Sequence, residues 1–410
     1  MIYHTFQKYR KRFFLAAFVF LLIFAADLLY DSIPDELYTV EGSEEEIHFS
    51  LPVTVEKTEE SLPVFWNNSK NVNQDIKISQ DYQVSCKFLN LIPVKEVSVH
   101  VVEKNYVMPS GIPIGIYTKT KGILIIGTGK VTASDGLVYE PADQIVKSGD
   151  YILKMNGKAV SKKEDLIDFV NESEGEAAVL TILREGKTIE VKIEPALLED
   201  GSYKLGIWVR DDMAGVGTLT YICQDLKYGA LGHPVSDGDT GSMIRLAEGK
   251  VYDTDIVGIV KGKDGSPGEL TGVINYKEEY CIGNIEKNTP TGICGTLKKV
   301  PEEMEDAYVE VGMKQEIHTG EAYILSALDG SLRQYRIEID EVDLNSREQN
   351  KGILFHVTDD LLLSETGGIV QGMSGSPILQ DGKIIGAVTH VFISDATKGY
   401  GVFIEKMIQH

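Results

Sequence analysis

The most apolar stretch of the chain lies close to its N-terminus, where hydrophobic positions run from Phe13 to Ala26 and resume between Asp27 and Tyr30. Lysine or arginine occupies four of the five positions from 8 to 12, immediately before this stretch. A basic flank followed by an apolar segment is typical of a signal peptide or signal anchor, and a membrane-spanning helix needs about 20 residues. No clear small-residue cleavage site follows, so the pattern predicts an uncleaved signal anchor over residues 1–30 that enters the membrane through residues 13–30. Basic flanks stay in the cytoplasm, so the rest of the chain is expected to face outward.

The pattern changes twice over the next 75 or so residues. Residues 31–60 are acidic and poor in aromatic residues, with three successive glutamates from Glu44 to Glu46, and this predicts a solvated spacer. From Asp81 to Val102 apolar and polar positions alternate and valine is frequent, which predicts strands. We therefore expect an acidic spacer over 31–60 and a small β unit over 61–105.

Residues 106–197 combine strand and helix patterns. A strand predicted at Tyr151–Met155 is followed by Asn156 and Gly157, which favour a type I′ hairpin turn. Ser161 and Glu164 have the spacing of a capping box, and apolar residues at helical spacing follow them. Two strand patterns around a Glu-Gly turn complete the region.

This order of elements resembles the PDZ domain family. The resemblance implies that a peptide adds as a strand to an exposed sheet edge. It places the terminal carboxylate at the backbone N–H groups of Ile114, Gly115 and Ile116, with the helix that starts at Ser161 as the other wall of the groove. The alternative is that Ile114 and Ile116 are only core residues of a strand.

From residue 201 to residue 410 glycines are frequent and helical periodicity is scarce. Short Val-, Ile- and Thr-rich segments recur, among them EAYILSAL, QYRIEIDEV and GILFHVT. Many short strands at fairly regular spacing predict a β-barrel or sandwich. The predicted fold class is thus mainly β: an N-terminal membrane anchor, a small β unit, a PDZ domain and a C-terminal β-barrel domain.

Composition narrows the function classes. The chain has 410 residues and a formal charge of −22, and an acidic surface argues against a nucleic-acid partner. No H-E-x-x-H motif or paired-histidine spacing occurs, so no metal and no other cofactor is expected. The four cysteines are too few and too scattered for a disulfide framework; a bridge between Cys281 and Cys294 is possible, and buried free thiols are the alternative.

The candidate chemistry lies in the motif Gly372-Met373-Ser374-Gly375-Ser376. A serine nucleophile needs a base to take its proton and an oxyanion hole of backbone N–H groups, which glycines allow in a tight turn. Ser374 is the predicted nucleophile, and the N–H groups of Gly372 and Ser374 are the predicted oxyanion hole. Ser376 is the weaker alternative, because the proline after it favours extended backbone.

The base is predicted to be His233, which lies in a glycine- and proline-flanked loop, the kind of segment where catalytic groups concentrate. His356 and His390 lie inside apolar strands and are expected to pack or bond within the sheet. Four carboxylates compete for the role of orienting the imidazole. These are Asp359, Asp360, Asp237 and Asp239, of which the last two are equally suited to Asx turns in the histidine loop.

The motif GMSGSP followed by ILQDGKIIGAVTHVF resembles the serine motif of chymotrypsin-like peptidases. Together with GHPVSDGDTG, the PDZ-like region and the N-terminal anchor, it resembles the SpoIVB family of sporulation serine peptidases over nearly the whole chain. The resemblance assigns the nucleophile to Ser374, the histidine to His233 and the acidic member to Asp359. Unlike the aspartate of ordinary chymotrypsin-like enzymes, which lies far upstream of the serine, Asp359 precedes Ser374 by only fifteen positions.

The resemblance also implies a biological role. Such a peptidase is exported from the forespore, stays anchored facing the space between two membranes, and releases itself by self-cleavage. It then cuts the extracytoplasmic part of a membrane regulatory complex, which triggers activation of a sigma factor. The PDZ domain would bind that protein substrate and also a second copy of the enzyme in trans. The rival hypothesis is a non-catalytic, membrane-anchored PDZ scaffold.

Overall fold

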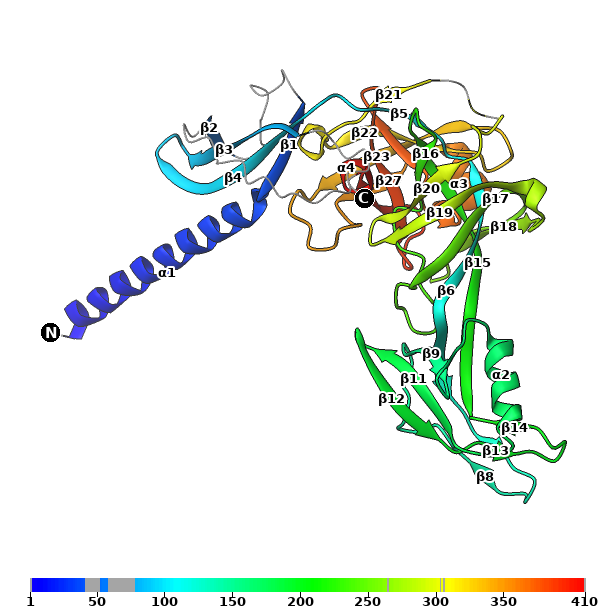
Figure 1. Ribbon diagram of the computed structural model, residues 1–410. Coiled ribbons are helices and arrows are strands. Elements are labelled where there is room, and N and C mark those ends of the chain that lie inside the picture. The colour runs from blue at the N-terminus through cyan, green and yellow to red at the C-terminus, as the bar shows by residue number, and fades with distance from the viewer. Residues whose placement is uncertain are drawn as a thin grey trace.

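The computed structural model describes residues 2–40, 52–57, 78–263, 265–302, 304 and 307–408. Helix α1 (Ile2–Ser32) extends away from the body and leads into a four-stranded sheet in the order β1-β4-β3-β2 (Figure 1). Its strands are β1 (Glu36–Val40), β2 (Val53–Lys57), β3 (Ile78–Phe88) and β4 (Ile92–Val102). Within the described ranges, the structure contains no helix whose length and apolar character suit it to crossing a membrane.

The range predicted as a solvated spacer contributes two strands to this sheet. β1 pairs in parallel with β4, and β2 pairs antiparallel with β3. Leu37 and Val40 are buried, and this apolar burial explains why the segment folds despite its acidic composition. The expected strands between Asp81 and Val102 are present as β3 and β4, whereas residues 41–51 and 58–77 lie outside the described part of the chain.

A lower unit in Figure 1 contains helix α2 (Lys163–Glu172) packed on a sheet whose order is β12-β11-β9-β6-β15. Its further strands are β7 (Val131–Thr132), β8 (Val138–Tyr139), β9 (Tyr151–Met155), β10 (Lys158–Ala159), β11 (Ala178–Arg184), β12 (Lys187–Ile193), β13 (Ala196–Leu197) and β14 (Tyr203–Lys204). The predicted hairpin turn is confirmed by positive φ angles of 47° at Asn156 and 78° at Gly157. The predicted capping pair is wrong, because the N-cap is Lys162 and the carboxylate of Asp165 accepts the N–H groups of Ser161 and Lys162.

Two 16-residue strands, β6 (Pro113–Thr128) and β15 (Ile207–Ile222), run side by side from the lower unit into the upper body (Figure 1). Their lower parts complete the sheet with α2, and their upper parts belong to the sheet of the body. β5 (Tyr106–Pro109) also pairs with body strands. Residues 106–120 therefore belong structurally with the segment after residue 201. The predicted start of the PDZ domain at residue 106 does not coincide with the start of the lower unit.

The structure corrects the peptide site predicted at Ile114, Gly115 and Ile116. These three residues lie in the upper half of β6, which pairs with β15 on one side and with β17 (Leu246–Val260) on the other. Both edges of the strand are thus occupied, and no peptide strand can add there. Ile114 and Ile116 are buried among body side chains, as the alternative of plain core residues predicted.

The upper body joins the rest of this sheet to a closed barrel in the order β22-β23-β24-β28-β27-β26. The sheet strands are β16 (Lys227–Ala230), β18 (Gly268–Ile274), β19 (Cys281–Thr289), β20 (Gly292–Leu297), β21 (Val309–Glu310) and β25 (Val370–Gln371). The barrel strands are β22 (Gly320–Ser326), β23 (Arg333–Val342), β24 (Ile353–Val357), β26 (Pro377–Gln380), β27 (Lys383–Val391) and β28 (Lys398–Phe403), with helices α3 (Asp360–Thr366) and α4 (Ile404–Ile408) beside them. The predicted mainly-β fold and C-terminal barrel are confirmed.

The barrel core predicts the cost of a large-to-small substitution. Phe355 is fully buried in the apolar cluster that fills the barrel. Phe355→Ala is expected to lower the free energy of unfolding of this unit by about 3–5 kcal/mol, because it removes apolar burial and leaves a cavity. Thermal unfolding measures the change, with Ile393→Ala, a substitution at an exposed side chain, as control. Equal effects of the two substitutions would contradict this packing.

Candidate active site

Ser374 lies in a tight turn between β25 and β26 whose backbone depends on glycine. Gly372 and Gly375 have φ angles of 101° and 98°, which side-chain-bearing residues rarely adopt. A Cβ on Gly375 would also meet the Thr218 oxygen at 2.2 Å and the Leu231 nitrogen at 2.5 Å. The turn therefore needs glycine both for its conformation and for close packing against two other backbone segments.

The N–H groups of this turn divide into two sets. Those of Met373, Gly375 and Ser376 donate to the carbonyls of other residues. Within the described ranges, no backbone carbonyl accepts from the N–H of Gly372 or Ser374. The two amides predicted to form the oxyanion hole are therefore the ones that remain available to a ligand.

The two serines of the motif occupy different environments. The Ser374 hydroxyl is half-buried and donates to the Thr389 carbonyl at 3.0 Å. The Ser376 hydroxyl is fully buried and has no hydrogen-bond partner in the described part of the protein. Of the two, only Ser374 is accessible enough for substrate, in agreement with the prediction that Ser374 and not Ser376 is the nucleophile.

His233 follows β16 in a loop that docks against the serine turn. Leu231 N–H donates to Thr218 O at 3.2 Å, and Thr218 N–H donates to Ser374 O at 3.0 Å. Gly232 lies against Thr389, where an added Cβ would come within 2.8 Å of the threonine methyl group. The histidine loop and the serine turn are thus held on the same residue of β15, with Thr389 beside both.

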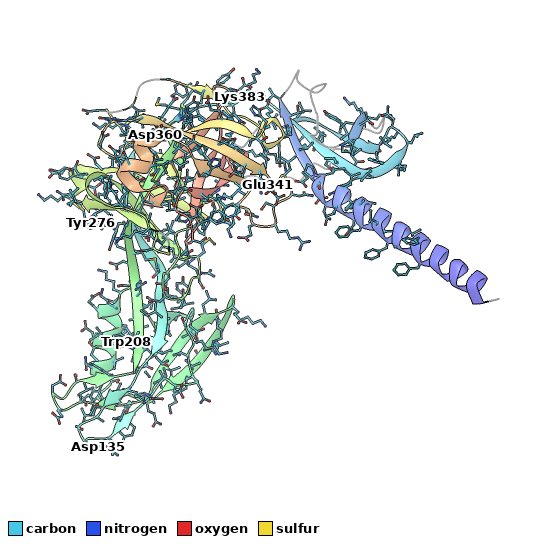
Figure 2. All side chains as sticks on the ribbon, turned by 180° about the vertical axis from the view of Figure 1, so that it is seen from behind. Asp135, Trp208, Tyr276, Glu341, Asp360 and Lys383 are labelled. Carbon is cyan, nitrogen blue, oxygen red and sulfur yellow. The ribbon has the colours of Figure 1, made fainter. Side chains whose placement is uncertain are left out.

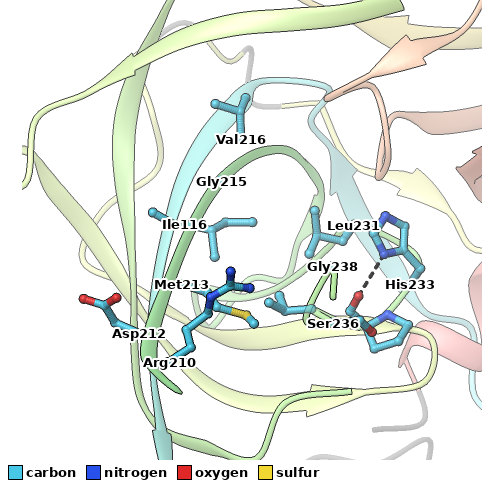
Figure 3. Close-up of a pocket in the computed structure, with 13 residues that line it drawn as sticks. Ile116, Arg210, Asp212, Met213, Gly215, Val216, Leu231, His233, Ser236 and Gly238 are labelled. Carbon is cyan, nitrogen blue, oxygen red and sulfur yellow. Dashed lines mark hydrogen bonds between the residues drawn. The ribbon is translucent and has the colours of Figure 1, made fainter. Parts of the chain in front are cut away.

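The imidazole of His233 is oriented by a backbone carbonyl. Nδ1 lies 2.9 Å from the Pro234 oxygen (Figure 3). Because a carbonyl can only accept, this contact places the proton on Nδ1 and leaves Nε2 with the lone pair that a general base requires. Within the described residues no hydrogen bond joins His233 to Ser374. Free enzymes often show such loose catalytic contacts before substrate binds.

Asp359 does not orient this imidazole in the structure. Its carboxylate caps α3 by accepting the N–H groups of Leu361 and Leu362, each at 3.0 Å, and it accepts the N–H of Arg336 at 3.2 Å. An aspartate that follows a strand and precedes a helix is favoured as an N-cap for this reason. The proposed triad position is therefore corrected to a helix cap, and Asp360 is the first residue of the same helix.

Asp237 and Asp239 brace the histidine loop. Asp237 is fully buried and accepts the N–H groups of Asp239 and Thr240, which is the Asx-turn alternative considered from the sequence. Arg210 forms ion pairs with both carboxylates. Asn288 secures the other side by bonding both the N–H and the carbonyl of Val235.

A second histidine lies beside the first. The ring centroids of His233 and His390 are 5.6 Å apart, and Thr389, the neighbour of His390, accepts the Ser374 hydroxyl. The sequence predicted that His390 packs or bonds within its strand. The sequence did not reveal the positions of these two neighbours. Thr389 is buried, whereas His390 is exposed at the end of β27 that lies next to the serine turn. His356 lies away from this site and pairs with Asp340.

Desolvation keeps both imidazoles neutral. The surrounding protein lowers the pKa of His233 below its ordinary value of 6.5, and the contact with Pro234 opposes this in part. The pKa of His390 falls to about 4, first through desolvation, although part of the ring stays exposed, and then through the charge that His233 can carry. A neutral imidazole is the form that accepts a proton from serine.

A cavity of about 510 Å³ opens beside His233. One wall is the stretch of β15 from Arg210 to Val216, and the other is the loop from Leu231 to Gly238 (Figure 3). Ile116 forms part of its floor. This cavity is large enough for several residues of a peptide, and Leu231, which lines it, is also the residue whose N–H donates to Thr218.

A second groove, of about 400 Å³, lies in the lower unit between α2 and β15. The segment from Leu205 to Val209 lines one side, and Leu166, Ile167 and Val170 of α2 line the other. Trp208, labelled in Figure 2, and Ile167 expose 65% and 55% of their surfaces there. This is the edge-strand-and-helix groove expected from the PDZ resemblance, at Leu205-Gly206-Ile207 instead of residues 114–116.

The sequence carried a signal for this groove that was missed. Leu205-Gly206-Ile207 matches an apolar-Gly-apolar pattern as well as Ile114-Gly115-Ile116 does. It was assigned to the following domain because it comes after the last strand of the PDZ-like pattern. No metal site of three or more His, Cys, Asp or Glu side chains occurs in the described ranges, and all four cysteines are free, so the suggested Cys281–Cys294 bridge is wrong.

The desolvated imidazole predicts a pH profile. His233 must be neutral to act as base, and burial lowers its pKa below the ordinary value of 6.5. The rate at which a fluorophosphonate modifies Ser374 is therefore expected to fall on the acid side with a midpoint below pH 6.5. An acid limb centred above pH 6.5 would contradict the desolvated site.

The cap at Asp359 predicts a difference between two substitutions. Asp359→Ala is expected to lower stability by about 1 kcal/mol, because it removes the side-chain acceptor at the helix N-terminus. Asp359→Asn keeps an acceptor and is expected to leave stability and catalytic rate close to wild type. If Asp359 oriented His233, the asparagine variant would instead lose roughly 10⁴-fold in kcat with the fold unchanged.

Comparisons with known proteins found two solved PDZ domains and one family model that match parts of this chain. The crystal structure of the PDZ domain of an SdrC-like protein from Listeria monocytogenes is 19% identical, covers 22% of this chain and 87% of that one, and has a TM-score of 0.18. The PDZ domain of the corresponding protein from Listeria innocua is 21% identical, covers 20% of this chain and 93% of that one, and has a TM-score of 0.17. The sequence model of the family described as SpoIVB peptidase S55 matches residues 201–408. That match spans just over half of the chain and includes both Ser374 and His233, and the protein therefore belongs to the SpoIVB peptidase S55 family, as a sporulation serine peptidase.

Proposed function

We propose that the protein is a serine endopeptidase in which Ser374 is the nucleophile and His233 the general base. The observation that carries this proposal is the docking of the serine turn and the histidine loop on the same residue, Thr218, through two backbone hydrogen bonds. Two segments more than 130 residues apart in sequence are thereby attached to one residue of β15, and His233 lines the cavity beside them.

The proposed reaction is acyl transfer to the serine, followed by hydrolysis. When a peptide binds, the Ser374 hydroxyl leaves the Thr389 carbonyl and donates to Nε2 of His233. The oxygen attacks the scissile carbonyl as Nε2 takes the proton, and the N–H groups of Gly372 and Ser374 hold the oxyanion. His233 then protonates the leaving amine. A water molecule next attacks the acyl-enzyme while His233 takes its proton, and His233 returns this proton to the Ser374 oxygen as the ester bond breaks.

The Pro234 carbonyl takes over the orienting role that a carboxylate has in many serine peptidases. It fixes the tautomer of His233 through Nδ1 but does not bring a negative charge beside the imidazolium ion. The expected consequence is a slower acylation step than with a buried aspartate, which suits a peptidase that cuts few substrates.

The biological role is proposed from family membership and the N-terminal sequence pattern. The chain is exported and anchored in the forespore membrane through residues 13–30, facing the space between two membranes. It cleaves itself free and then cuts the extracytoplasmic part of a membrane regulatory complex, and this triggers sigma-factor activation during sporulation. The groove between α2 and β15 binds the substrate and also a second copy of the enzyme in trans.

The rival function is a membrane-anchored PDZ scaffold without catalysis. The resting hydrogen bond from Ser374 to Thr389, in place of one to His233, favours it. Covalent labelling by a fluorophosphonate in the presence of a groove-binding peptide distinguishes the two functions. A scaffold would stay unlabelled, whereas the endopeptidase would carry the label on Ser374.

The nucleophile is tested by a matched pair of serine variants. Ser374→Ala is expected to abolish self-processing and to reduce cleavage by on the order of 10⁴–10⁶-fold without unfolding the protein. Ser376→Ala removes a buried hydroxyl that has no hydrogen-bond partner among the described residues, so it is expected to keep both cleavage and stability. Mass spectrometry of the mature N-termini reads out self-processing, and a purified Ser374→Ala protein that still trims itself would disprove the assignment.

A further inference from the structure

The outer edge of β15 is open beside the serine turn. Thr218 is paired with Pro113 of β6, and proline has no N–H to donate, so this pair exchanges no ladder bonds. The N–H and carbonyl of Thr218 point instead away from β6, to Ser374 and Leu231. The direction of these two groups identifies which residues of β15 face outward.

In an antiparallel ladder the outward-facing residues alternate. The register with β6 is unbroken from Asp212 to Thr218, so Val216 and Ala214 face the same way as Thr218. Both line the cavity next to His233, and in the described part of the chain no strand pairs with β15 on this side between Ile207 and Val216. A peptide strand that adds here passes directly beside Ser374.

The same edge continues into the groove of the lower unit. β15 is the last strand of the lower sheet, and its residues Ile207 to Val209 form the wall opposite α2. The register with β6 shifts twice on this stretch, between Trp208 and Val209 and between Arg210 and Asp212. The N-terminus of α2 is attached at the second shift by the bond from Lys163 N–H to the Asp211 carboxylate at 2.9 Å. The groove and the cavity therefore share one backbone edge, roughly ten residues and about 30 Å long.

The charge of the groove indicates the occupant. Every charged residue that lines it is a lysine, namely Lys130, Lys163 and Lys204, in a protein whose formal charge is −22. Lys163 pairs with Asp211 at 3.7 Å and Lys130 with Glu140 at 3.4 Å. Lys204 lies two residues before Gly206, whose φ is 67°, at the start of β15. A C-terminal carboxylate is the group that such an end of an open strand accommodates, as backbone amides and lysines both favour it.

On the basis of the proposed peptidase function, we propose that β15 fixes the number of residues between the substrate's C-terminus and the peptide bond that is cleaved. An extended segment with a free carboxylate at Gly206 pairs antiparallel with the whole outer edge of β15. Its chain then runs from the groove toward Val216, so the bond at Ser374 is about eight to twelve residues upstream of the carboxylate. Recognition and cleavage thus occur on one continuous added strand.

The test uses the full-length protein and a library of peptides of 15–30 residues made by digesting a denatured proteome. Half of the library is amidated at its C-termini, and mass spectrometry maps every cut relative to the C-terminus. The free-carboxylate half is expected to show a narrow peak of cuts about eight to twelve residues from the end, and the amidated half is expected to lose at least tenfold in that peak. Cuts spread evenly along the free-carboxylate peptides would overturn the proposal while leaving the peptidase function intact.

Two variants test the groove and the edge separately. Ile167→Asp places a negative charge in the groove at an exposed position and is expected to remove the peak, whereas Val138→Asp, an equally exposed position of the lower unit, is expected to keep it. Ala214→Pro removes an outward N–H without breaking a bond to β6 and is expected to lower cleavage at the peak at least tenfold. Thermal unfolding and fluorophosphonate labelling of Ser374 confirm that this variant is folded, and a persistent peak in either Ile167→Asp or Ala214→Pro would overturn the proposal.

If the wild-type protein cuts no peptide and a fluorophosphonate does not label Ser374, the proposed function fails, and the proposed role of β15 fails with it. If Ser374 is labelled and peptides are cut, only the position of the cuts decides the further inference.

Discussion

The structure of the candidate site depends on one backbone residue, Thr218. Its N–H and carbonyl are free of the β-ladder because its partner is Pro113, and they hold the serine turn and the histidine loop instead. Its hydroxyl donates to the Gly372 carbonyl at 2.8 Å and so holds the peptide that lies between the two predicted oxyanion amides, those of Gly372 and Ser374. Close packing around Thr218 also requires a glycine at position 375, because there is no room for a Cβ between Thr218 and Leu231.

Electrostatics at the site depend on desolvation more than on charge pairing. His233 is oriented by a neutral carbonyl, and burial lowers its pKa, as it lowers that of His390. Carboxylates near the loop are occupied elsewhere, with Asp237 binding Arg210 and backbone amides and Asp359 capping α3. The result is a base that is neutral over a wide pH range but has no negative charge to stabilise its protonated form.

The sequence predicted those features whose physical cause is local. The glycine-flanked serine, the loop histidine, the type I′ turn and the mainly-β barrel were all identified from neighbouring residues. The errors arose where distant segments decide the environment. Ile114 and Ile116 look like an exposed PDZ strand until β17 covers their second edge, and Leu205-Gly206-Ile207 looks like an interdomain segment until β15 proves to belong to both units. Asp359 looks like a triad member because it follows a predicted strand and the family resemblance assigns it that role, but the helix that starts after it uses its carboxylate.

The central claim is that Ser374 and His233 form the catalytic pair, with His233 oriented by the Pro234 carbonyl. A crystal structure of the protein after reaction with a fluorophosphonate tests it most directly. The account predicts phosphorus bonded to Ser374 Oγ, the phosphoryl oxygen within hydrogen-bonding distance of the Gly372 and Ser374 amides, and His233 Nδ1 still at the Pro234 oxygen with Nε2 facing the adduct. Modification of another residue, or an imidazole that turns Nδ1 to Asp359, would contradict it.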